Sequence, residues 1–123
     1  MRTSFDADDL PDALDGAPPA ALDDLPFGVI GLDAGGRVVA YNAFEQRLAG
    51  LDPADVLGRD FFVDVAPCTN NFMVRERFFE AWEADAALDE RLRYTFTYRM
   101  KPTRVVLRLL VRGERGWVVV QPE

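Results

Sequence analysis

The sequence predicts one α+β domain, built as a five-stranded antiparallel sheet with helices across one face and a helical cap at the N-terminus. Two observations carry this prediction. The strand-like and helix-like patterns come in the order two strands, several helices and three strands, so a helical segment has to cross the sheet. The chain has 123 residues, of which 49% are apolar, and this suits a single core. We expect residues 1–24 to form the cap and residues 25–123 the core domain.

The N-terminal cap is expected to be the least stable part of the molecule. Its aspartate-rich turns and the pair Pro18-Pro19 favour two short helices, at residues 8–14 and 19–24. Residues 1–24 hold seven aspartates against Arg2, so acidic side chains of the cap can rest against basic strands. Large apolar residues are few, and we therefore expect a loose attachment that buries little; they are Phe5, Leu10, Leu14 and Leu22.

Strands are expected at both ends of the core domain. Residues 28–32 and 37–41 form a hairpin, in which Gly35-Gly36 supplies the positive φ angles of a tight turn. Residues 92–100 alternate strictly, which places the apolar members on one face of a strand. These members are Leu92, Tyr94, Phe96, Tyr98 and Met100. Residues 105–111 and 117–121, joined by a turn at 113–116, complete the sheet.

Helices are expected between the two groups of strands. Asn42 can cap a helix that runs to residue 48 or 49 and ends at Gly50, and Asp52-Pro53 opens a further turn that ends at Gly58. Asn70 or Asn71 can start a longer helix to about residue 84. One face of that helix is apolar, with Val74, Phe78, Ala81 and Trp82. A pocket is expected between these helices and the sheet.

The composition excludes several classes of site and partner. Cys68 is the only cysteine and there is no histidine, so an internal disulfide, a typical zinc site and a cysteine–histidine pair are excluded. Residues 91–115 carry eight basic residues against Glu114. We interpret them as the solvent face of a sheet rather than a nucleic-acid surface, because a chain of net charge −7 repels phosphate.

The chain lacks the sequence signals of membrane insertion and export. No apolar run approaches the roughly 20 residues of a membrane-spanning helix, and the aspartate-rich N-terminus has no signal-peptide pattern. We therefore expect a cytoplasmic protein that has no contact with a membrane.

Tyr41 and Glu45 are candidate binding residues. They are four residues apart at the start of a helix, so the phenol and the carboxyl can project to one side. A desolvated carboxyl group tends to keep its proton and can then donate a hydrogen bond to an anion. On position alone, an exposed glutamate on a surface helix and a tyrosine in the core remain open as the alternative.

Cys68 is the candidate attachment point for a ligand. An isolated cysteine is usually a packing residue. Here Pro67 fixes the backbone before the thiol, and Thr69 to Asn71 offer a helix start whose amides would stabilise a thiolate or a carbonyl oxygen. The aromatic stripe on the strand at 92–100 is compatible both with ordinary core and with a pocket wall.

At these residues the sequence resembles the photoactive yellow protein family, which are blue-light receptors built on a PAS fold. The specific elements are Pro67-Cys68-Thr69 and the combination of Tyr41-Asn42 with Glu45. The likeness covers nearly all of the chain after the cap. It runs in register through Phe27-Gly28, Leu32-Asp33, Gly50, Asp52-Pro53, Gly58, Phe61-Phe62, residues 64–69, Tyr94-Thr95-Phe96, Tyr98, Met100 and Pro102-Thr103.

The resemblance implies a photoreceptor rather than an enzyme. In the family, the cysteine matching Cys68 forms a thioester with 4-hydroxycinnamic (p-coumaric) acid, and the residues matching Tyr41 and Glu45 hold its phenolate. Strand positions matching Phe96, Tyr98 and Met100 flank this chromophore. We expect the rest of the chromophore site at Ala49, Leu51, Phe61, Val65, Ala66, Pro67 and Thr69.

The resemblance also implies how light would act. Light-driven trans–cis isomerisation would displace the phenolate and let Glu45 give up its proton, and a buried unpaired carboxylate costs several kcal/mol. We expect the cap to detach in response. The chain departs from well-known members at Phe44, Ala49 and Leu51, where a small residue, a threonine and an arginine are usual, so we expect an altered colour or photocycle rate.

Other readings compete with the photoreceptor. A PAS module that binds another ligand or a partner protein, without the chromophore, is the main alternative. A thiol enzyme is disfavoured because no histidine can activate Cys68, and a flavin-type sensor has its cysteine in a different helix context. The chain ends soon after the last expected strand. We expect a monomer that passes its signal to a separate, unknown protein.

Overall fold

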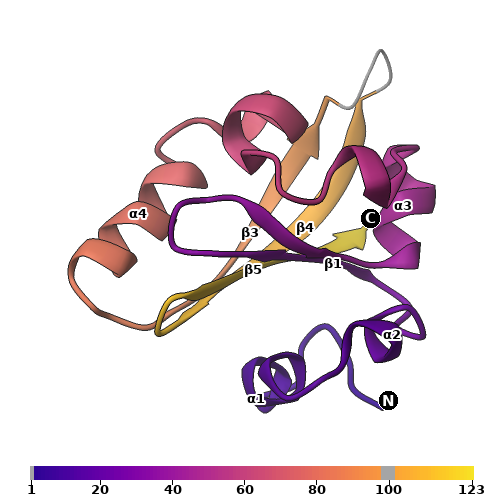
Figure 1. Cartoon of the computed structure of the whole chain (residues 1–123), viewed down its shortest axis with the longest axis horizontal. Coiled ribbons are helices and arrows are strands. Elements are labelled where there is room, and N and C mark those ends of the chain that lie inside the picture. The colour runs from indigo at the N-terminus through magenta and orange to yellow at the C-terminus, as the bar shows by residue number, and fades with distance from the viewer. Residues whose placement is uncertain (1, 98–101) are drawn as a thin grey trace.

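The computed structural model of the chain describes residues 2–97 and 102–123, and it contains the expected five-stranded antiparallel sheet (Figure 1). The strands lie in the order β2-β1-β5-β4-β3. In chain order the elements are α1 (Leu10–Asp15), α2 (Pro19–Leu22), β1 (Gly28–Leu32), β2 (Val38–Tyr41), α3 (Ala43–Ala49), the short turns η1 (Pro53–Asp55), η2 (Phe61–Val65) and η3 (Pro67–Thr69), α4 (Arg75–Glu83), β3 (Leu88–Phe96), β4 (Thr103–Arg112) and β5 (Arg115–Pro122). The predicted α+β architecture, a five-stranded antiparallel sheet with helices across one face and an N-terminal helical cap, is confirmed.

The hairpin turn between β1 and β2 differs in detail from the prediction. Among its two glycines only Gly36 has a positive φ, of 83°. The Asp33 side chain closes the turn, because Oδ1 accepts hydrogen bonds from the backbone N–H groups of Gly35 and Arg37, each at 2.9 Å. The expectation that both glycines supply positive φ is therefore wrong. The Asp33 carboxylate stabilises the turn instead of a second glycine with positive φ.

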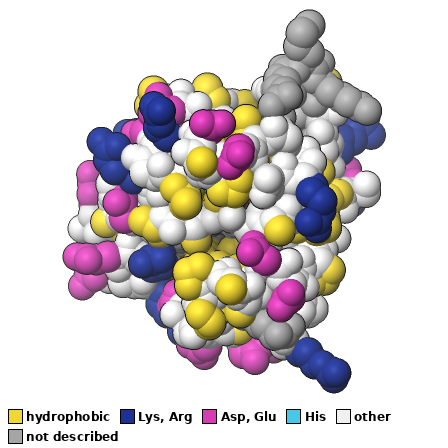
Figure 2. All heavy atoms as spheres, turned by 45° about the vertical axis from the view of Figure 1, so that its right-hand side comes forward, with side chains coloured by type: hydrophobic (Ala, Val, Ile, Leu, Met, Phe, Trp, Pro, Cys, Tyr) yellow, Lys and Arg dark blue, Asp and Glu magenta, His cyan; other side chains and the backbone are white. Residues whose placement is uncertain are grey.

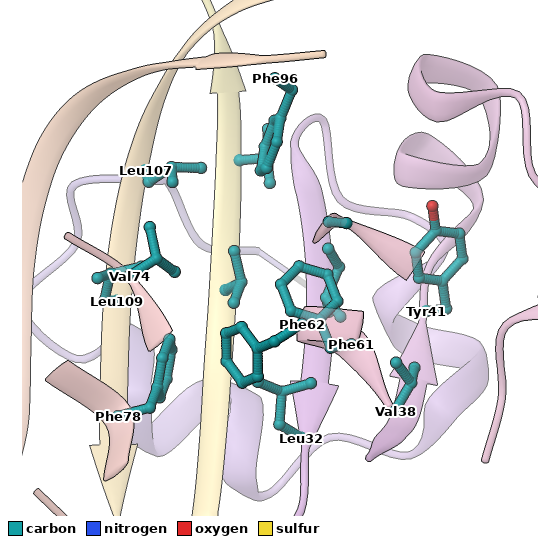
Figure 3. Close-up of a cluster of buried hydrophobic side chains, with 14 of the residues drawn as sticks. Leu32, Val38, Tyr41, Phe61, Phe62, Val74, Phe78, Phe96, Leu107 and Leu109 are labelled. Carbon is teal, nitrogen blue, oxygen red and sulfur yellow. The ribbon is translucent and has the colours of Figure 1, made fainter. Parts of the chain in front are cut away.

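The sheet is covered on both faces, and each face has its own apolar cluster. Figure 1 shows α1 and α2 on one side of the sheet and α4 with the segments before it on the other. The cluster under α3, η2 and α4, here the site-side core, includes Ile30, Leu32, Tyr41, Phe61, Phe62, Phe78, Phe96, Leu107 and Leu109 (Figure 3). The cluster under the cap, here the cap-side core, includes Phe5, Leu10, Leu14, Leu22, Leu25, Val29, Leu110, Trp117 and Val119.

The cap is packed more firmly than the sequence predicts. Its four large apolar residues are all buried, and the most accessible of them, Phe5, is 7% exposed. They pack on outward-facing side chains of the sheet such as Val29 and Trp117. The expectation that the cap buries little is therefore wrong, because the strands beneath it are apolar on both faces.

The basic residues of the last three strands are partly neutralised by acidic side chains. The prediction that cap aspartates rest on basic strands is confirmed, since Asp6 pairs with Arg91 at 3.0 Å and Asp12 pairs with Arg112. Arg108 does not lie on a solvent face as predicted but is 1% exposed beneath the cap. Figure 2 shows basic and acidic side chains interspersed on the face turned to the viewer, without a continuous basic patch.

Helix α4 and strand β3 begin at other residues than predicted. Helix α4 starts at Arg75 rather than at Asn70 or Asn71. Asn71 instead caps the preceding turn, where its Oδ1 accepts from the N–H groups of Met73 (2.9 Å) and Val74 (3.1 Å). Strand β3 starts four residues early, at Leu88, because it pairs with residues 103–111 of β4. Tyr98 and Met100 lie outside the described residues.

Across residues 2–97 and 102–123, none of the helices combines the length and the apolar character that crossing a bilayer requires.

Candidate functional site

The junction of β2 and α3 places Tyr41 and Glu45 around a capping asparagine. Asn42 is 1% exposed, and its Oδ1 accepts from the N–H groups of Glu45 (3.1 Å) and Val29 (2.9 Å). Its Nδ2 donates to the carbonyl oxygens of Leu22 and Phe27, each at 2.9 Å. The predicted helix cap is confirmed. One side chain thus joins β1, α3 and the end of α2.

Glu45 is fully buried, which removes the alternative of an exposed glutamate on a surface helix. Its exposure is 0%, and its carboxyl group lies against β1 at Gly28. A Cβ atom at Gly28 would collide with Oε1 of Glu45, so only glycine leaves room for the carboxyl group there. The sequence thus provides a titratable group inside an apolar layer, where its ionised form is costly.

Tyr41 is buried beside it in the site-side core. Its hydroxyl group has no hydrogen-bond partner among the described residues. In Figure 3 this hydroxyl points away from Val38, at the edge of the cluster. Burial raises the pKa of Tyr41 well above its usual value, and the neighbouring Glu45 carboxyl raises it further. Tyr41 is therefore a buried donor at neutral pH, ready to donate to an anionic acceptor.

Cys68 opens onto a small cavity. The thiol is half-buried on η3, and the cavity has a volume of about 170 Å³. Six predicted site residues line it together with Thr97, which was not predicted; the six are Ala49, Leu51, Val65, Ala66, Pro67 and Cys68. Four segments thus meet at the thiol: the end of α3, the loop after it, the η2–η3 turn and the end of β3.

Of the other predicted site residues that the structure describes, none lines this cavity. Tyr41, Phe61 and Phe96 are buried in the site-side core, to which Ala49 and Ala66 also belong. Glu45 and Thr69 are fully buried, and the Thr69 hydroxyl donates to the Ala66 carbonyl oxygen at 2.7 Å. The structure therefore brings Cys68 and the predicted residues around it together at one cavity, and it buries the Tyr41–Glu45 pair on the same side of the sheet.

Two residues at Cys68 were missed as site residues. The Tyr94 hydroxyl donates to the carbonyl oxygen of Cys68. The Nδ2 group of Asn71 donates both to that carbonyl oxygen (3.0 Å) and to the Tyr94 hydroxyl (2.6 Å). The available signal was the position of Tyr94 on the face of β3 that also carries Phe96. Nothing in the sequence showed that Asn71 reaches back to Cys68.

Tyr94 is placed to donate a hydrogen bond at Cys68. The pKa of Tyr94 is raised overall. Burial is the largest cause, the hydrogen bond from Asn71 lowers the pKa, and the nearby Cys68 raises it. Tyr94 therefore stays protonated at neutral pH and donates, rather than removing the thiol proton. Among the residues that the structure describes, no group of histidine, cysteine and acidic side chains is placed to hold a metal ion.

Comparisons with known proteins agree with this geometry. The family model described as the PAS fold matches residues 17–121. The chain is 40% identical over 119 residues to photoactive yellow protein of Rhodothalassium salexigens, covering 95% of this chain and 94% of the relative. It is 42% identical over 119 residues to photoactive yellow protein of Halochromatium salexigens, with the same coverage.

A solved structure matches as well. The photoactive yellow protein domain of the sensor histidine kinase Ppr from Rhodospirillum centenum superimposes with a TM-score of 0.82 at 38% identity. The match covers 89% of this chain and 97% of that domain. The likeness therefore extends from the sequence to the arrangement of the whole fold.

Proposed function

Because the chain belongs to the photoactive yellow protein family, we propose that it is a blue-light photoreceptor whose Cys68 carries a p-coumaroyl group as a thioester. One observation carries this proposal. The buried Tyr41 hydroxyl makes no hydrogen bond within the described residues, beside a fully buried Glu45. Buried polar groups are nearly always hydrogen-bonded, so an orphaned donor calls for a missing acceptor.

The residues present suit this chromophore. A thioester needs a thiol at the edge of a cavity, and Cys68 meets that condition. Pockets for drug-sized ligands have volumes of about 300–1,000 Å³, so the smaller cavity at Cys68 suits a single-ring acyl group. The walls nearest the thiol are apolar, as an aromatic ring requires, and they come from Ala49, Leu51, Val65, Ala66 and Pro67.

Each residue then has a definite role. Cys68 attaches the acyl group, while the hydroxyl of Tyr41 and the protonated carboxyl of Glu45 donate to the phenolate oxygen at the far end. Phe61 and Phe96 close the site from the site-side core. We assign Tyr98 and Met100 to the same wall on the family resemblance alone, and both stay predictions.

The light response follows from the burial of these groups. When bound, the chromophore supplies light absorption and isomerisation about its double bond. Glu45 would then give its proton to the phenolate oxygen as their hydrogen bond is disturbed, which would leave a carboxylate in a fully buried position. An uncompensated buried charge costs several kcal/mol, a large part of the 5–15 kcal/mol that stabilises a typical domain.

The strain would reach the cap through Asn42. The N–H group of Glu45 donates to Asn42, whose Nδ2 group in turn donates to the Leu22 carbonyl oxygen at the end of α2. A displacement of α3 at Glu45 therefore loosens a link to the cap. Release of the cap is the proposed signal, and a separate signalling protein in the cytoplasm is its proposed receiver.

Chromophore attachment is the test. The unmodified protein is mixed with activated p-coumaric acid, and the mass of the intact chain and the visible spectrum are recorded. We expect a mass increase located at Cys68 and a visible band that bleaches in blue light. The control is Cys68→Ala, which should gain neither. An absent adduct, or one unchanged in the control, would instead favour a PAS module that binds another ligand.

A further inference from the structure

The carbonyl oxygen of Cys68 is held by two side chains from different elements. Tyr94 reaches it from β3, and Asn71 reaches it from the turn before α4. The two side chains also contact each other through the 2.6 Å hydrogen bond from Asn71 Nδ2 to the Tyr94 hydroxyl. These three groups form a closed triangle, named here the Cys68 clamp.

Both members of the clamp are themselves fixed. The Oδ1 atom of Asn71 is occupied by the N–H groups of Met73 and Val74, so the direction of the Nδ2 group is set by the turn. The ring of Tyr94 packs edge-on against Phe96, with ring centroids 5.7 Å apart and an angle of 70° between the planes. Neither donor can leave the carbonyl oxygen without breaking another contact.

The clamp removes a specific freedom from Cys68. The peptide group is planar, so a fixed carbonyl oxygen fixes the plane that joins Cys68 to Thr69. On the other side Pro67 has a restricted φ angle, and Thr69 is tied to the Ala66 carbonyl oxygen by its hydroxyl and its N–H group. Rotation about χ1 is then the main freedom left to the Cys68 side chain. Cys68 is one of the residues that line the cavity.

We propose that Asn71 and Tyr94 are positioning residues, which direct the Cys68 thiol into the cavity by fixing its carbonyl oxygen. A turn before α4 would need only the Oδ1 atom of Asn71, whereas the Nδ2 group faces Cys68 and Tyr94. The acylation of the thiol rests on the proposed function. The direction of the thiol does not, since it can be measured without a chromophore.

Two variants remove the clamp and keep its surroundings. Tyr94→Phe removes the donor hydroxyl and keeps the ring that packs on Phe96. Asn71→Ser removes the amide donors and keeps a side-chain oxygen of a type that caps helix starts well. The matched control is Asn70→Ser, the same substitution one residue earlier, at an exposed position.

The first measurement reads the hydrogen bonds directly. Because Cys68 is the only cysteine, cysteine labelled with ¹³C at the carbonyl marks this one carbonyl group in the infrared spectrum. We expect its band to move to higher frequency in Tyr94→Phe and in Asn71→Ser, since both lose a donor, and to stay in place in Asn70→Ser. An unmoved band in both clamp variants would show that the clamp does not exist.

The second measurement reads the direction of the thiol. The folded, chromophore-free protein is treated with iodoacetamide, and separately with activated p-coumaric acid. We expect the clamp variants to be alkylated about tenfold faster and acylated about tenfold more slowly than the parent, because a thiol that leaves its position turns from cavity to solvent. Asn70→Ser should match the parent in both rates.

The outcomes separate the two proposals. If the parent takes up no acyl group, the proposed function fails, and the alkylation rates still test the clamp. If the infrared band moves while the alkylation rates of both clamp variants equal that of the parent, the hydrogen bonds exist but do not position the thiol. That result would overturn the inference.

Discussion

The two faces of the sheet are closed in different ways. On the cap side, the buried guanidinium group of Arg108 binds both carboxylate oxygens of Asp89, at 2.9 and 2.8 Å, and donates to the carbonyl oxygens of Phe5 (3.0 Å) and Ala7 (2.7 Å). On the site side, the buried Tyr41 hydroxyl has no partner within the described residues. On the cap side a buried charged group is paired within the chain, whereas on the site side a buried hydroxyl group calls for an additional acceptor.

This difference suggests that the two faces of the sheet have different roles. The cap side is held by the hydrogen bonds of Arg108 over an apolar cluster. The site side keeps a buried tyrosine and a buried glutamate whose ionisation changes the free energy of folding. The Asn42 side chain connects the two, since it accepts from the N–H group of Glu45 and donates to the Leu22 carbonyl oxygen. Substitutions on the cap side and on the site side should therefore affect stability in different ways.

The largest loss of stability is expected at Asn42, which connects the two faces. Asn42→Ala removes the helix cap and leaves buried backbone groups at Val29, Leu22 and Phe27 without this partner. We expect a loss of about 3–5 kcal/mol in the free energy of unfolding by urea. The control Asn42→Ser keeps an acceptor oxygen for the helix cap without adding a charge and should lose less. A loss below about 1 kcal/mol in Asn42→Ala would mean that the two faces are not joined here.

The cap side should be broken by Arg108→Met. This change strands the Asp89 carboxylate and two backbone carbonyl oxygens. Removing one partner of a buried pair costs about 3–5 kcal/mol, and because Asp89 is partly exposed we expect about 2–3 kcal/mol. The matched control is Arg91→Met, whose exposed pair with Asp6 is worth at most about 1 kcal/mol. If Arg108→Met and Arg91→Met lose the same amount of stability in urea unfolding, Arg108 does not hold the cap side.

The site side should respond to alkaline pH. The pKa of Tyr41 is raised in the folded chain, so above pH 10, its value in the unfolded chain, only the unfolded state loses this proton. The stability of the chromophore-free protein should fall by up to about 1.4 kcal/mol per pH unit as the pH rises above this value. Tyr41→Phe should lessen this fall and should not destabilise the chain at pH 7. A large loss at pH 7 would show that the hydroxyl already has a partner.

The smallest effect on stability is expected when Ala49, which lines the cavity at Cys68, is replaced by a larger residue. Ala49→Thr adds a hydroxyl group at the edge of the cavity and should shift the absorption maximum and the dark recovery rate of the loaded protein. The change in the free energy of unfolding should stay below about 1 kcal/mol. Ala49→Val has nearly the same shape without the hydroxyl group and is the control. If both variants absorb and recover like the parent, Ala49 does not tune the chromophore.

The sheet was predictable because its signals are local. Alternation at 92–100, the apolar, β-branched runs of the other strands and the turns between them located all five strands, and the Asn42 cap followed from its position at the start of a helix. The firm packing of the cap had a signal that the interpretation of residues 1–24 did not use. Residues 117–120 are apolar without alternation, and such runs are typical of strands that are buried on both faces.

The contacts that cross the fold were not predictable. Arg108 looked like one more basic residue on a strand, and only the meeting of cap, β3 and β4 makes it a buried clamp. The same holds for Asn71 and Tyr94, which are 23 residues apart in the chain. The expectation of an attachment point at Cys68 came from the local motif and the family resemblance, whereas the side chains that hold its carbonyl oxygen depend on tertiary structure.

The central claim is that a charge change on the site side releases the cap side. Hydrogen exchange of the chromophore-loaded protein, measured in the dark and under continuous blue light, tests it most directly. We predict that residues 2–24 lose protection in the light, while the central strands β4 and β5 keep most of theirs. Equal protection of residues 2–24 in the dark and in the light would contradict the account.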